Sequence, residues 1–396
     1  MKRFLGYCVL TVLTLVVVSC SSNGSEPTRS TEKTLFVFMP WSSGAEKPYT
    51  HNLYTYFSTN IQDMETAIAG QHGLGRTRLL VYIAQSPTRA ALIEIRYTGK
   101  ACTRDTLKHY ADYDAMTAAG IAGILGDVRT HAEADTYAMI IGCHGTGWLP
   151  RGLTGYYKTR AFGGTEARFQ ADLADLADGI TRAAMPMQFI AFDDCYMAGI
   201  EVAYDLKDVT HYLIASTSEI MAAGLPYRTI WPYLCATTPN YEAIVNGFYS
   251  YYSHGTYPYG TLSVIDCQQT EAMAQLMRTF NARYTFDPTQ ENRLQKLDGM
   301  GQTIFFDMGS YISHLCDAAD VSQFDAMVAR LVPYHVHTPK IYTNLSQVNG
   351  GLSTVDINTF SGITISDPTT NTYVAGRKSL TAWWKATHTQ STTAAE

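Results

Sequence analysis

The hydrophobic residues of this chain form two alternating patterns, short unbroken runs and longer segments in which they recur every three or four positions. An unbroken apolar run is typical of a strand buried on both faces, and the longer spacing marks one face of a helix. The runs occupy 34–39, 78–85, 136–142, 188–193 and 211–216, and helical spacing occurs between them at 52–70, 114–131, 166–184 and 201–206. This alternation predicts an α/β fold with a mostly parallel central sheet and helices on both faces.

A hairpin strand is also predicted at 92–98. The second half of the chain is less regular, with a predicted strand at 260–266 and short apolar pieces at 302–308 and 362–365. Predicted helices occupy 230–235, 241–251, 269–286, 308–316, 321–332 and 378–385. We find neither a repeat nor a linker, so we expect residues 238–396 to form a C-terminal part packed on a main unit of residues 33–237.

The N-terminus has the pattern of a targeting segment. Lys2 and Arg3 precede an apolar stretch at 4–18 that is too short to favour a permanent membrane span. Ser19 and Cys20 follow directly, as in a bacterial lipoprotein signal, which would be cleaved before Cys20 and lipidated there. The alternative is a plain secretory signal. We expect a signal peptide at 1–19, a flexible tether at 20–32 and a lipid-anchored location in the bacterial cell envelope, periplasmic or at the cell surface.

Composition narrows the function. Charged residues make up 16% of the 396 residues and the net charge is -6, without a basic block, so nucleic acid is an unexpected partner. The cysteines beyond the N-terminus are widely spaced, without a disulfide or zinc pattern: Cys102, Cys143, Cys195, Cys235, Cys267 and Cys316. His335 and His337 lack a third ligand in the sequence, and no loop of the EF-hand type supports calcium. We expect a monomer without metal or cofactor.

A histidine and a cysteine each follow one of the predicted strands. His144 comes after the run 136–142 and Cys195 after the run 188–193. Since the carboxyl ends of parallel strands meet at one edge of a sheet, both side chains should emerge there. A thiol that attacks a carbonyl needs a group to take and return its proton, which imidazole can do near neutral pH. The pair therefore predicts a cysteine-peptidase site, with the N–H groups of Gly145 and Cys195 as oxyanion donors.

Two motifs resemble a known family. The motifs are His-Gly-x-Gly-Trp at 144–148 and Asp-x-Cys at 193–195, and Cys195 follows His144 by 51 positions. They are similar to motifs of the clostripain family, which belongs to the caspase-like cysteine peptidases together with gingipains and legumain. The likeness covers roughly 35–231. It implies a caspase-like catalytic domain and an endopeptidase that cleaves after Arg or Lys by a His144–Cys195 dyad. It also implies that Asp193 lies at the base of the pocket for the basic side chain.

Strand geometry supports Asp193, and not Asp194, as the residue of the substrate pocket. Side chains alternate along a strand, so Asp193 shares a face with Cys195 while Asp194 points the other way and should hydrogen-bond at the strand end. Trp148 and Ser216 are further candidates for substrate binding. Glu201 and Glu219 could equally be supporting residues or surface charges.

The loop between the two motifs is a candidate for self-cleavage. Members of the family are often made as single chains that cut themselves there, and 149–166 is Gly-rich with Lys158 and Arg160 as candidate points. The alternative is an ordinary basic surface loop. Two other functions stay open: a catalytically silent caspase-like binding lipoprotein, and a cysteine-dependent amidase or acyltransferase. The expected partners are peptides with Arg or Lys at the cleavage site, and the membrane through the lipid on Cys20.

Overall fold

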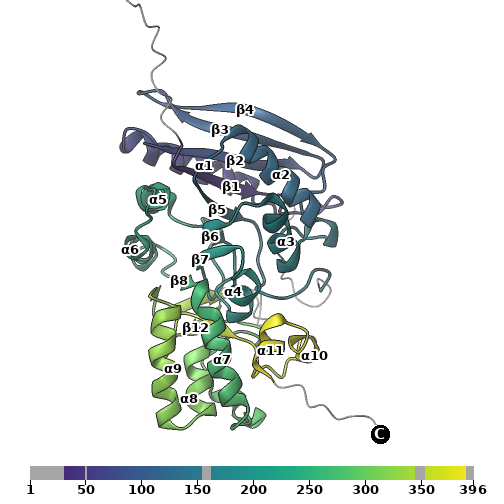
Figure 1. Cartoon of the computed structure of the whole chain (residues 1–396), viewed down its shortest axis with the longest axis vertical. Coiled ribbons are helices and arrows are strands. Elements are labelled where there is room, and N and C mark those ends of the chain that lie inside the picture. The colour runs from purple at the N-terminus through teal and green to yellow at the C-terminus, as the bar shows by residue number, and fades with distance from the viewer. Residues whose placement is uncertain (1–30, 50, 154–161, 344–352, 389–396) are drawn as a thin grey trace, which may run out of the picture. The chain divides into compact units, whose positions relative to one another are not determined.

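The structure is a computed structural model, and it describes residues 31–49, 51–153, 162–343 and 353–388. Its centre is a nine-stranded sheet with the order β10-β8-β7-β6-β5-β1-β2-β3-β4 (Figure 1). These strands are β1 (Lys33–Met39), β2 (Thr77–Ser86), β3 (Arg89–Tyr97), β4 (Cys102–Ala111), β5 (Thr136–Gly142), β6 (Met187–Asp193), β7 (Thr210–Ala215), β8 (Thr261–Asp266) and β10 (Tyr334–His337). The five central strands, from β7 to β2, are parallel, and β3, β4, β8 and β10 extend the sheet in antiparallel pairings. The predicted mostly parallel sheet is confirmed.

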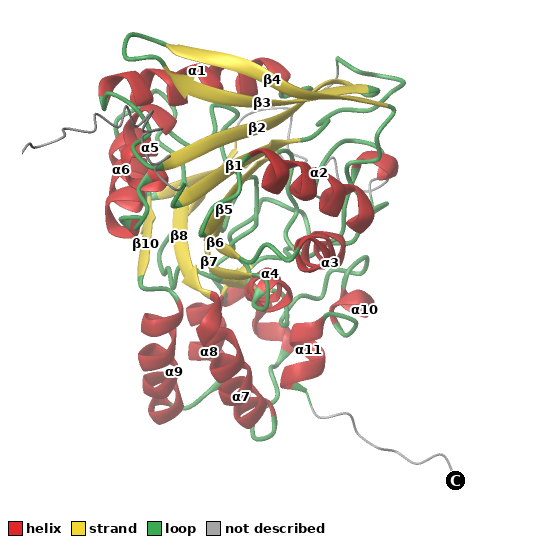
Figure 2. Ribbon diagram, turned by 45° about the horizontal axis from the view of Figure 1, so that its top comes forward, coloured by secondary structure: helices red, strands yellow, loops and turns green. Residues whose placement is uncertain are grey.

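Helices cover both faces of the sheet (Figure 2). One face packs on α1 (Tyr54–Gly70), α5 (Tyr227–Cys235) and α6 (Tyr241–Ser253). The other packs on α2 (Ala118–His131), α3 (Leu173–Ala183), α4 (Ile200–Leu206) and α7 (Thr270–Asn281). Along β1, Leu35 and Val37 enter the first core while Phe36 and Phe38 enter the second, so an unbroken apolar run serves both layers.

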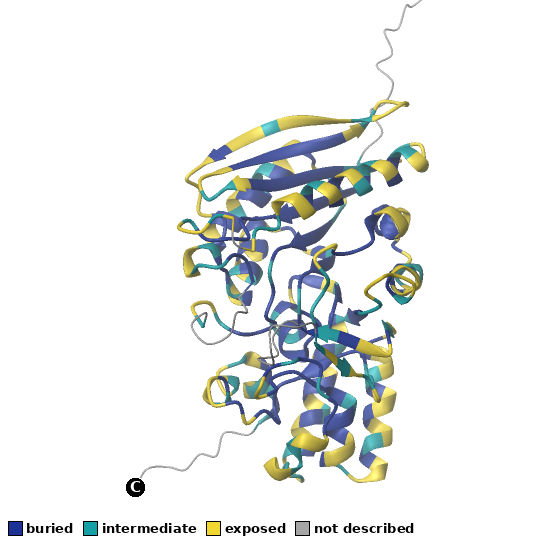
Figure 3. Ribbon diagram, turned by 180° about the vertical axis from the view of Figure 1, so that it is seen from behind, coloured by how far each residue is buried: buried dark blue, intermediate teal, exposed yellow. Residues whose placement is uncertain are grey.

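The outermost strand β4 was not predicted. Most of its side chains are exposed, as Figure 3 shows along the edge of the sheet. An edge strand without a buried face carries no apolar alternation, and its polar residues protect the edge from pairing with other chains. Its existence depends on the hydrogen bonds with β3.

Two helix predictions need correction. The segment 166–184 contains a 3-10 turn, Ala167–Phe169, and α3 begins only at Leu173, where Asp172 and Asp175 form a capping box. The prediction of a single helix at 378–385 is wrong, because two short helices, α10 (Ala375–Lys378) and α11 (Ala382–Thr387), occupy this part of the chain. The Thr381 hydroxyl accepts the Trp384 N–H and so begins the second helix.

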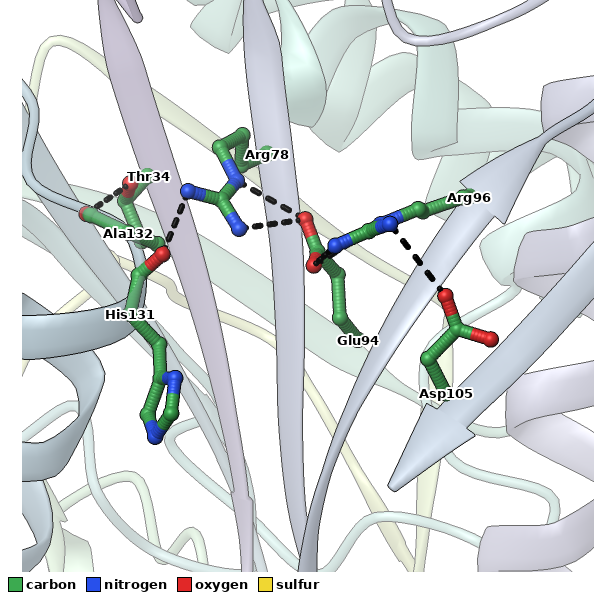
Figure 4. Close-up of polar contacts among 7 residues, drawn as sticks. All are labelled: Thr34, Arg78, Glu94, Arg96, Asp105, His131 and Ala132. Atoms are coloured by element: carbon green, nitrogen blue, oxygen red, sulfur yellow. Dashed lines mark hydrogen bonds and ion pairs between the residues drawn. The ribbon is translucent and has the colours of Figure 1, made fainter. Parts of the chain in front are cut away.

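A buried carboxylate holds α2 against the sheet (Figure 4). Glu94 of β3 is 3% exposed and pairs with Arg78 of β2, with 2.7 Å between Oε1 and Nη2, and with Arg96. The Arg78 guanidinium also donates to the His131 carbonyl, and the Thr34 hydroxyl donates to the Ala132 carbonyl at 2.7 Å. The last carbonyls of α2 thereby gain partners that the helix itself cannot supply.

The C-terminal residues complete the sheet and add a helical layer. The strands β8 and β10 join the same sheet as β1 to β7, so the sheet includes residues on both sides of position 237. The remaining elements are α8 (Met308–Leu315), α9 (Ala318–Leu331), the 3-10 turns Cys267–Gln269 and Pro288–Arg293, and the short strands β9 (Phe306–Asp307), β11 (Lys340–Thr343), β12 (Ser353–Asp356) and β13 (Thr364–Ile365). Within the described residues, no helix combines the length and hydropathy that crossing a bilayer requires.

Candidate active site

His144 and Cys195 stand at matching positions beyond two neighbouring strands. The last residues of β5 and β6, Gly142 and Asp193, are register partners in a parallel pair. His144 and Cys195 each come two residues later and line one cavity of about 370 Å³. The structure therefore brings the imidazole and the thiol to the same edge of the sheet.

The His144 backbone is held on both sides by one residue. Its N–H donates to the Gly163 carbonyl at 3.2 Å, and the Gly163 N–H donates back to the His144 carbonyl at 2.9 Å. Gly163 has a φ of +126°, and a Cβ there would collide with the Phe169 carbonyl, so only glycine fits. On the ring of His144, Nε2 lies 2.9 Å from the carbonyl oxygen of His51. Since a carbonyl only accepts, Nε2 carries a proton, and Nδ1 is the basic nitrogen of the neutral ring.

Cys195 is half-buried and rests as a neutral thiol. Burial raises the pKa of Cys195, and the nearby Glu219 carboxylate raises it further. The Ile220 N–H donates to Sγ at 3.4 Å, which favours the thiolate but does not outweigh the other two effects. Ionisation of this cysteine consequently needs a base at the site.

Asp193 is a buried carboxylate in the wall of the cavity. It accepts the Leu225 N–H at 2.8 Å and the Tyr227 hydroxyl at 2.9 Å. Gly224, at a φ of +74°, packs against its carboxylate so closely that a Cβ would lie 2.5 Å from Oδ2. Burial raises the pKa of Asp193 to about 6, although these two hydrogen bonds lower it. The described residues that line the cavity include two histidines, His51 and His144, but no lysine or arginine.

Asp194 joins the ends of the two strands. Its carboxylate accepts the Cys143 N–H, and the Cys143 thiol lies 3.3 Å from Oδ2. Burial raises the pKa of Asp194 to about 8, while the bond from the Cys143 N–H lowers it. Its geometry agrees with a hydrogen-bonding residue at the strand end.

Gly145 lies directly against the nucleophile's backbone. A Cβ at Gly145 would lie 2.5 Å from the Cys195 carbonyl oxygen and 3.2 Å from its nitrogen. Across the described ranges, neither the Gly145 N–H nor the Cys195 N–H donates a hydrogen bond to the protein. Both donors are therefore compatible with binding an oxyanion.

The turn after Cys195 is strained and strongly anchored. Tyr196 has a φ of +65°, which is rare for a bulky residue. Its N–H donates to the Ser218 carbonyl at 3.0 Å, its hydroxyl donates to Glu219 Oε1 at 3.0 Å, and its ring stacks on Phe305. These contacts hold a conformation that aims Cys195 into the cavity.

Two of the predicted substrate-binding side chains point elsewhere. Trp148 is 7% exposed and donates its Nε1–H to the Ser366 hydroxyl at 2.8 Å, and it lines a different cavity, between α3 and α11. Ser216 is fully buried and its hydroxyl pairs with that of Thr261 at 2.9 Å. Neither side chain lines the cavity that contains Cys195, because each is held in the core by its hydrogen bond. Lys158, Arg160 and Cys20 lie outside the described residues.

Glu219, which the sequence left open as a supporting residue or a surface charge, lines the cavity. Other lining residues were not predicted: Tyr56 and Asn60 come from α1, Met221 from the loop after β7, and Tyr342 from β11. The Asn60 amide donates to the Ala223 carbonyl at 2.9 Å and fastens that loop to α1. Tyr342 is far from the motifs in sequence and has no local signal, so only the fold could reveal it.

Comparisons with known proteins agree with this geometry. A family model described as the clostripain family, Peptidase_C11, matches residues 47–334. A secreted C11 cysteine protease of Bacteroides thetaiotaomicron, "iotapain", is 43% identical with a TM-score of 0.83, over 91% of this chain and 99% of that one. Among curated proteins none matches this chain.

Two further solved structures are similar. A clostripain from Bacteroides thetaiotaomicron ATCC 29148, in complex with the peptide inhibitor BTN-VLTK-AOMK, is 49% identical with a TM-score of 0.54, over 57% of this chain and 99% of that one. An inactive zymogen C11 protease from Parabacteroides distasonis shares the fold, at 24% identity and a TM-score of 0.78, over 92% and 99% of the two chains.

Proposed function

Because this chain belongs to the clostripain family of cysteine peptidases, we propose that it is an endopeptidase that cleaves after arginine or lysine, with Cys195 and His144 as its catalytic dyad. The observation that carries the proposal is the placement of these two residues at matching positions beyond β5 and β6, on one cavity. A pair of structural residues would not need to share a solvent-accessible cavity.

The proposed reaction follows from the chemistry of the two groups. His144 Nδ1 takes the proton of the Cys195 thiol, and the thiolate attacks the scissile carbonyl carbon. The N–H groups of Gly145 and Cys195 stabilise the resulting oxyanion. The imidazolium then gives its proton to the leaving amine as the C–N bond breaks, and a thioester remains. Water, deprotonated by His144, hydrolyses the thioester and restores the thiol.

Specificity for a basic side chain is supported by the charge of the cavity. Asp193 offers a carboxylate within it, and the described lining contains no lysine or arginine that would neutralise this charge. A substrate cation that pairs with a buried carboxylate gains a charge-assisted hydrogen bond, whereas a neutral side chain leaves the charge unpaired. The inhibitor bound by the clostripain relative has VLTK as its peptide part, and lysine is the last residue of VLTK.

We extend the proposal to processing and location. Cleavage after Lys158 or Arg160 would open the loop between the dyad residues, and lipid on Cys20 would hold the enzyme in the cell envelope. Secretion of the iotapain relative supports export of this chain. We also expect the enzyme to be active without an added cofactor.

Hydrolysis of matched fluorogenic peptides tests the proposal. The purified protein should cleave peptides with Arg or Lys before the scissile bond, and Cys195→Ala should lower kcat by at least about a thousandfold. Cys316→Ala is the control, since Cys316 is also half-buried with a raised pKa but lies outside the cavity. Full activity of Cys195→Ala, or wild-type protein that cleaves none of these peptides, would contradict the proposal.

A further inference from the structure

A second cavity opens at the same edge of the sheet as the catalytic one. It has a volume of about 410 Å³ and lies beyond the carboxyl ends of β1 and β2, where Trp41 follows β1 and Ser86 ends β2. In the order of the sheet, these two strands come directly after β5, on the side away from β6 (Figure 2). The reaction proposed above uses none of the residues that line this cavity.

A series of aromatic rings forms one wall of the second cavity. The rings of Tyr82, Tyr110 and Tyr113 contact one another in turn, with 5.2 Å and 5.1 Å between successive centroids. The hydroxyls of the last two are bonded outside the cavity, since Tyr110 donates to Asp127 at 2.8 Å and Tyr113 donates to the Gly120 carbonyl at 3.0 Å. Tyr113 is 38% exposed, so the series ends in a ring that a ligand can reach.

The charged residues of the second cavity favour neither a cation nor an anion. Its described lining contains two arginines and two aspartates, Arg89, Arg168, Asp112 and Asp114. Arg168 is already paired with Glu166, with 3.2 Å between Nε and Oε2. Because the two signs balance, the aromatic wall is the feature of this cavity that can select a ligand.

One residue separates the second cavity from the catalytic histidine. Gly163 exchanges two backbone hydrogen bonds with His144, and it also forms a β-bridge with Gln170. A Cβ at Gly163 would lie 2.2 Å from the Phe169 carbonyl oxygen and 2.9 Å from Met116 Cε. Both Phe169 and Met116 line the second cavity. Since bridged residues lie about 5 Å apart, two such steps place this cavity roughly 10 Å from His144.

The proposed reaction decides which part of a peptide would reach this cavity. Asp193, the proposed partner of the basic side chain, is bonded by Leu225 and Tyr227, which follow β7, so the acyl part of the peptide lies on that side of Cys195. The leaving amine must face the imidazole of His144, which follows β5. The peptide beyond the amine therefore continues toward β1 and β2. An extended chain advances about 3.3 Å per residue, so two or three residues cover most of 10 Å.

We infer that the second cavity is a substrate subsite: it binds an aromatic side chain of the leaving peptide, two or three residues after the scissile bond. The inference rests on the proposed endopeptidase activity and adds a preference on the other side of the cleaved bond. An aromatic ring bound here extends the series of ring contacts beyond Tyr113 and is removed from water. Alanine at the same position of the peptide gains neither contact.

Internally quenched peptides measure this preference. All of them have arginine before the scissile bond, and phenylalanine or alanine stands at the first, second or third position after it. For the wild type, kcat/KM should be about tenfold higher with phenylalanine than with alanine at the second or third position, without such a gain at the first. A matched arginyl aminomethylcoumarin substrate has no residue beyond the bond and measures the dyad without the subsite.

Two variants test the cavity by opposite changes. In Tyr113→Ala, which removes the outermost ring, the ratio of kcat/KM for the phenylalanine peptide over the coumarin substrate should fall about tenfold, and Tyr113→Phe should keep the wild-type ratio. Thr88 is exposed at the cavity, so Thr88→Trp should fill it and lower the same ratio without removing a ring. Tyr249→Ala is the control, because Tyr249 is 41% exposed on α6 and lines neither cavity. It should leave the ratio unchanged.

The coumarin substrate separates failure of the inference from failure of the proposed function. If the wild type cleaves it but shows no phenylalanine preference at the second or third position, or if folded Tyr113→Ala or Thr88→Trp keeps that preference, the inference is overturned and the proposed function stands. An equal loss on the coumarin and phenylalanine substrates in Tyr113→Ala would show a structural role and overturn it as well. Faster coumarin cleavage with free N-acetylphenylalanine amide would show an effector site instead of a substrate subsite. A wild type that cleaves no basic substrate contradicts the proposed function, and the subsite fails with it.

Discussion

The Nε2 atom of His144 lies 2.9 Å from the backbone carbonyl oxygen of His51, which lies three positions before the first residue of α1 and lines the same cavity. The bond requires a proton on Nε2 and leaves Nδ1 as the base. His51 itself has a φ of +58°, in the left-handed region that few residues other than glycine adopt. The position of the carbonyl that orients the imidazole thus depends on a left-handed backbone conformation at residue 51.

Substitution at His51 should reveal this orientation. Valine at a positive φ costs roughly 1–2 kcal/mol, so His51→Val should shift the carbonyl and lower kcat about tenfold to a hundredfold. Glycine accepts the same backbone, and His51→Gly should keep kcat within about twofold of wild type. His72 is the control, because it has a φ of +61° beyond the end of α1: His72→Val should lower the free energy of unfolding but not kcat. Equal kcat for the two His51 variants would argue against the role of its backbone.

A methyl group at Gly145 should strongly reduce activity. The added Cβ would lie 2.5 Å from the Cys195 carbonyl, so Gly145→Ala must displace the nucleophile or an oxyanion donor, and kcat/KM should fall at least about a hundredfold. Gly126 of α2 has open space around it. Gly126→Ala should leave kcat/KM unchanged and raise the free energy of unfolding by about 0.5–1 kcal/mol. Steady-state kinetics and denaturant unfolding of both variants check this, and an active Gly145→Ala would refute the close packing.

Recognition of a basic side chain should depend on the ionisation of Asp193. Its pKa is raised to about 6, so its charged fraction grows as the pH rises through that value. The ratio of kcat/KM for an arginine peptide over a citrulline peptide should therefore rise about tenfold from pH 5 to pH 7, while the pH dependence of the dyad cancels in the ratio. In Asp193→Asn the ratio should be low and independent of pH. A wild-type ratio without a step near pH 6 would exclude Asp193 as the recognising carboxylate.

The free energy of unfolding should depend on pH because of the buried Lys33. Lys33 is fully buried; its Nζ donates to the Leu234 carbonyl at 2.9 Å and the Ala236 carbonyl at 2.8 Å, and it lies over the Phe189 ring. Burial lowers its pKa from 10.5 to about 7, while the neighbouring Cys235 raises it. Between these two values the unfolded chain binds more protons than the folded one, so the free energy of unfolding increases with pH from about 7 to 10.

Lys33→Met should remove this dependence. The wild type should gain roughly 2–4 kcal/mol relative to Lys33→Met between pH 7 and pH 10, measured by denaturant unfolding at several pH values. Below pH 7 the difference between the two proteins should be constant, because Lys33 is then protonated in both the folded and the unfolded state. Parallel curves for the two proteins across the whole range would show that Lys33 keeps an ordinary pKa.

Much of the sheet and the two motif residues could be predicted from local sequence. The unbroken run at 136–142 coincides with β5, and the helical spacing at 52–70 marks α1, because burial imposes a period on residues close in the chain. The relation between His144 and Cys195 could be anticipated as well, since the carboxyl ends of parallel strands meet at one edge. Sequence therefore determined the fold class and the motif positions, where the deciding forces act within one element and its neighbours.

Tertiary structure decided the rest. Trp148 and Ser216 look equally suited to substrate from their motif positions, yet each is turned into the core by a partner distant in the chain, Ser366 or Thr261. Glu219 gains its place beside the thiol from a loop that Tyr196 and Asn60 hold down. The orientation of such side chains is set by the total free energy of many long-range contacts. The spacing of hydrophobic residues within one helix or strand contains no information about those contacts.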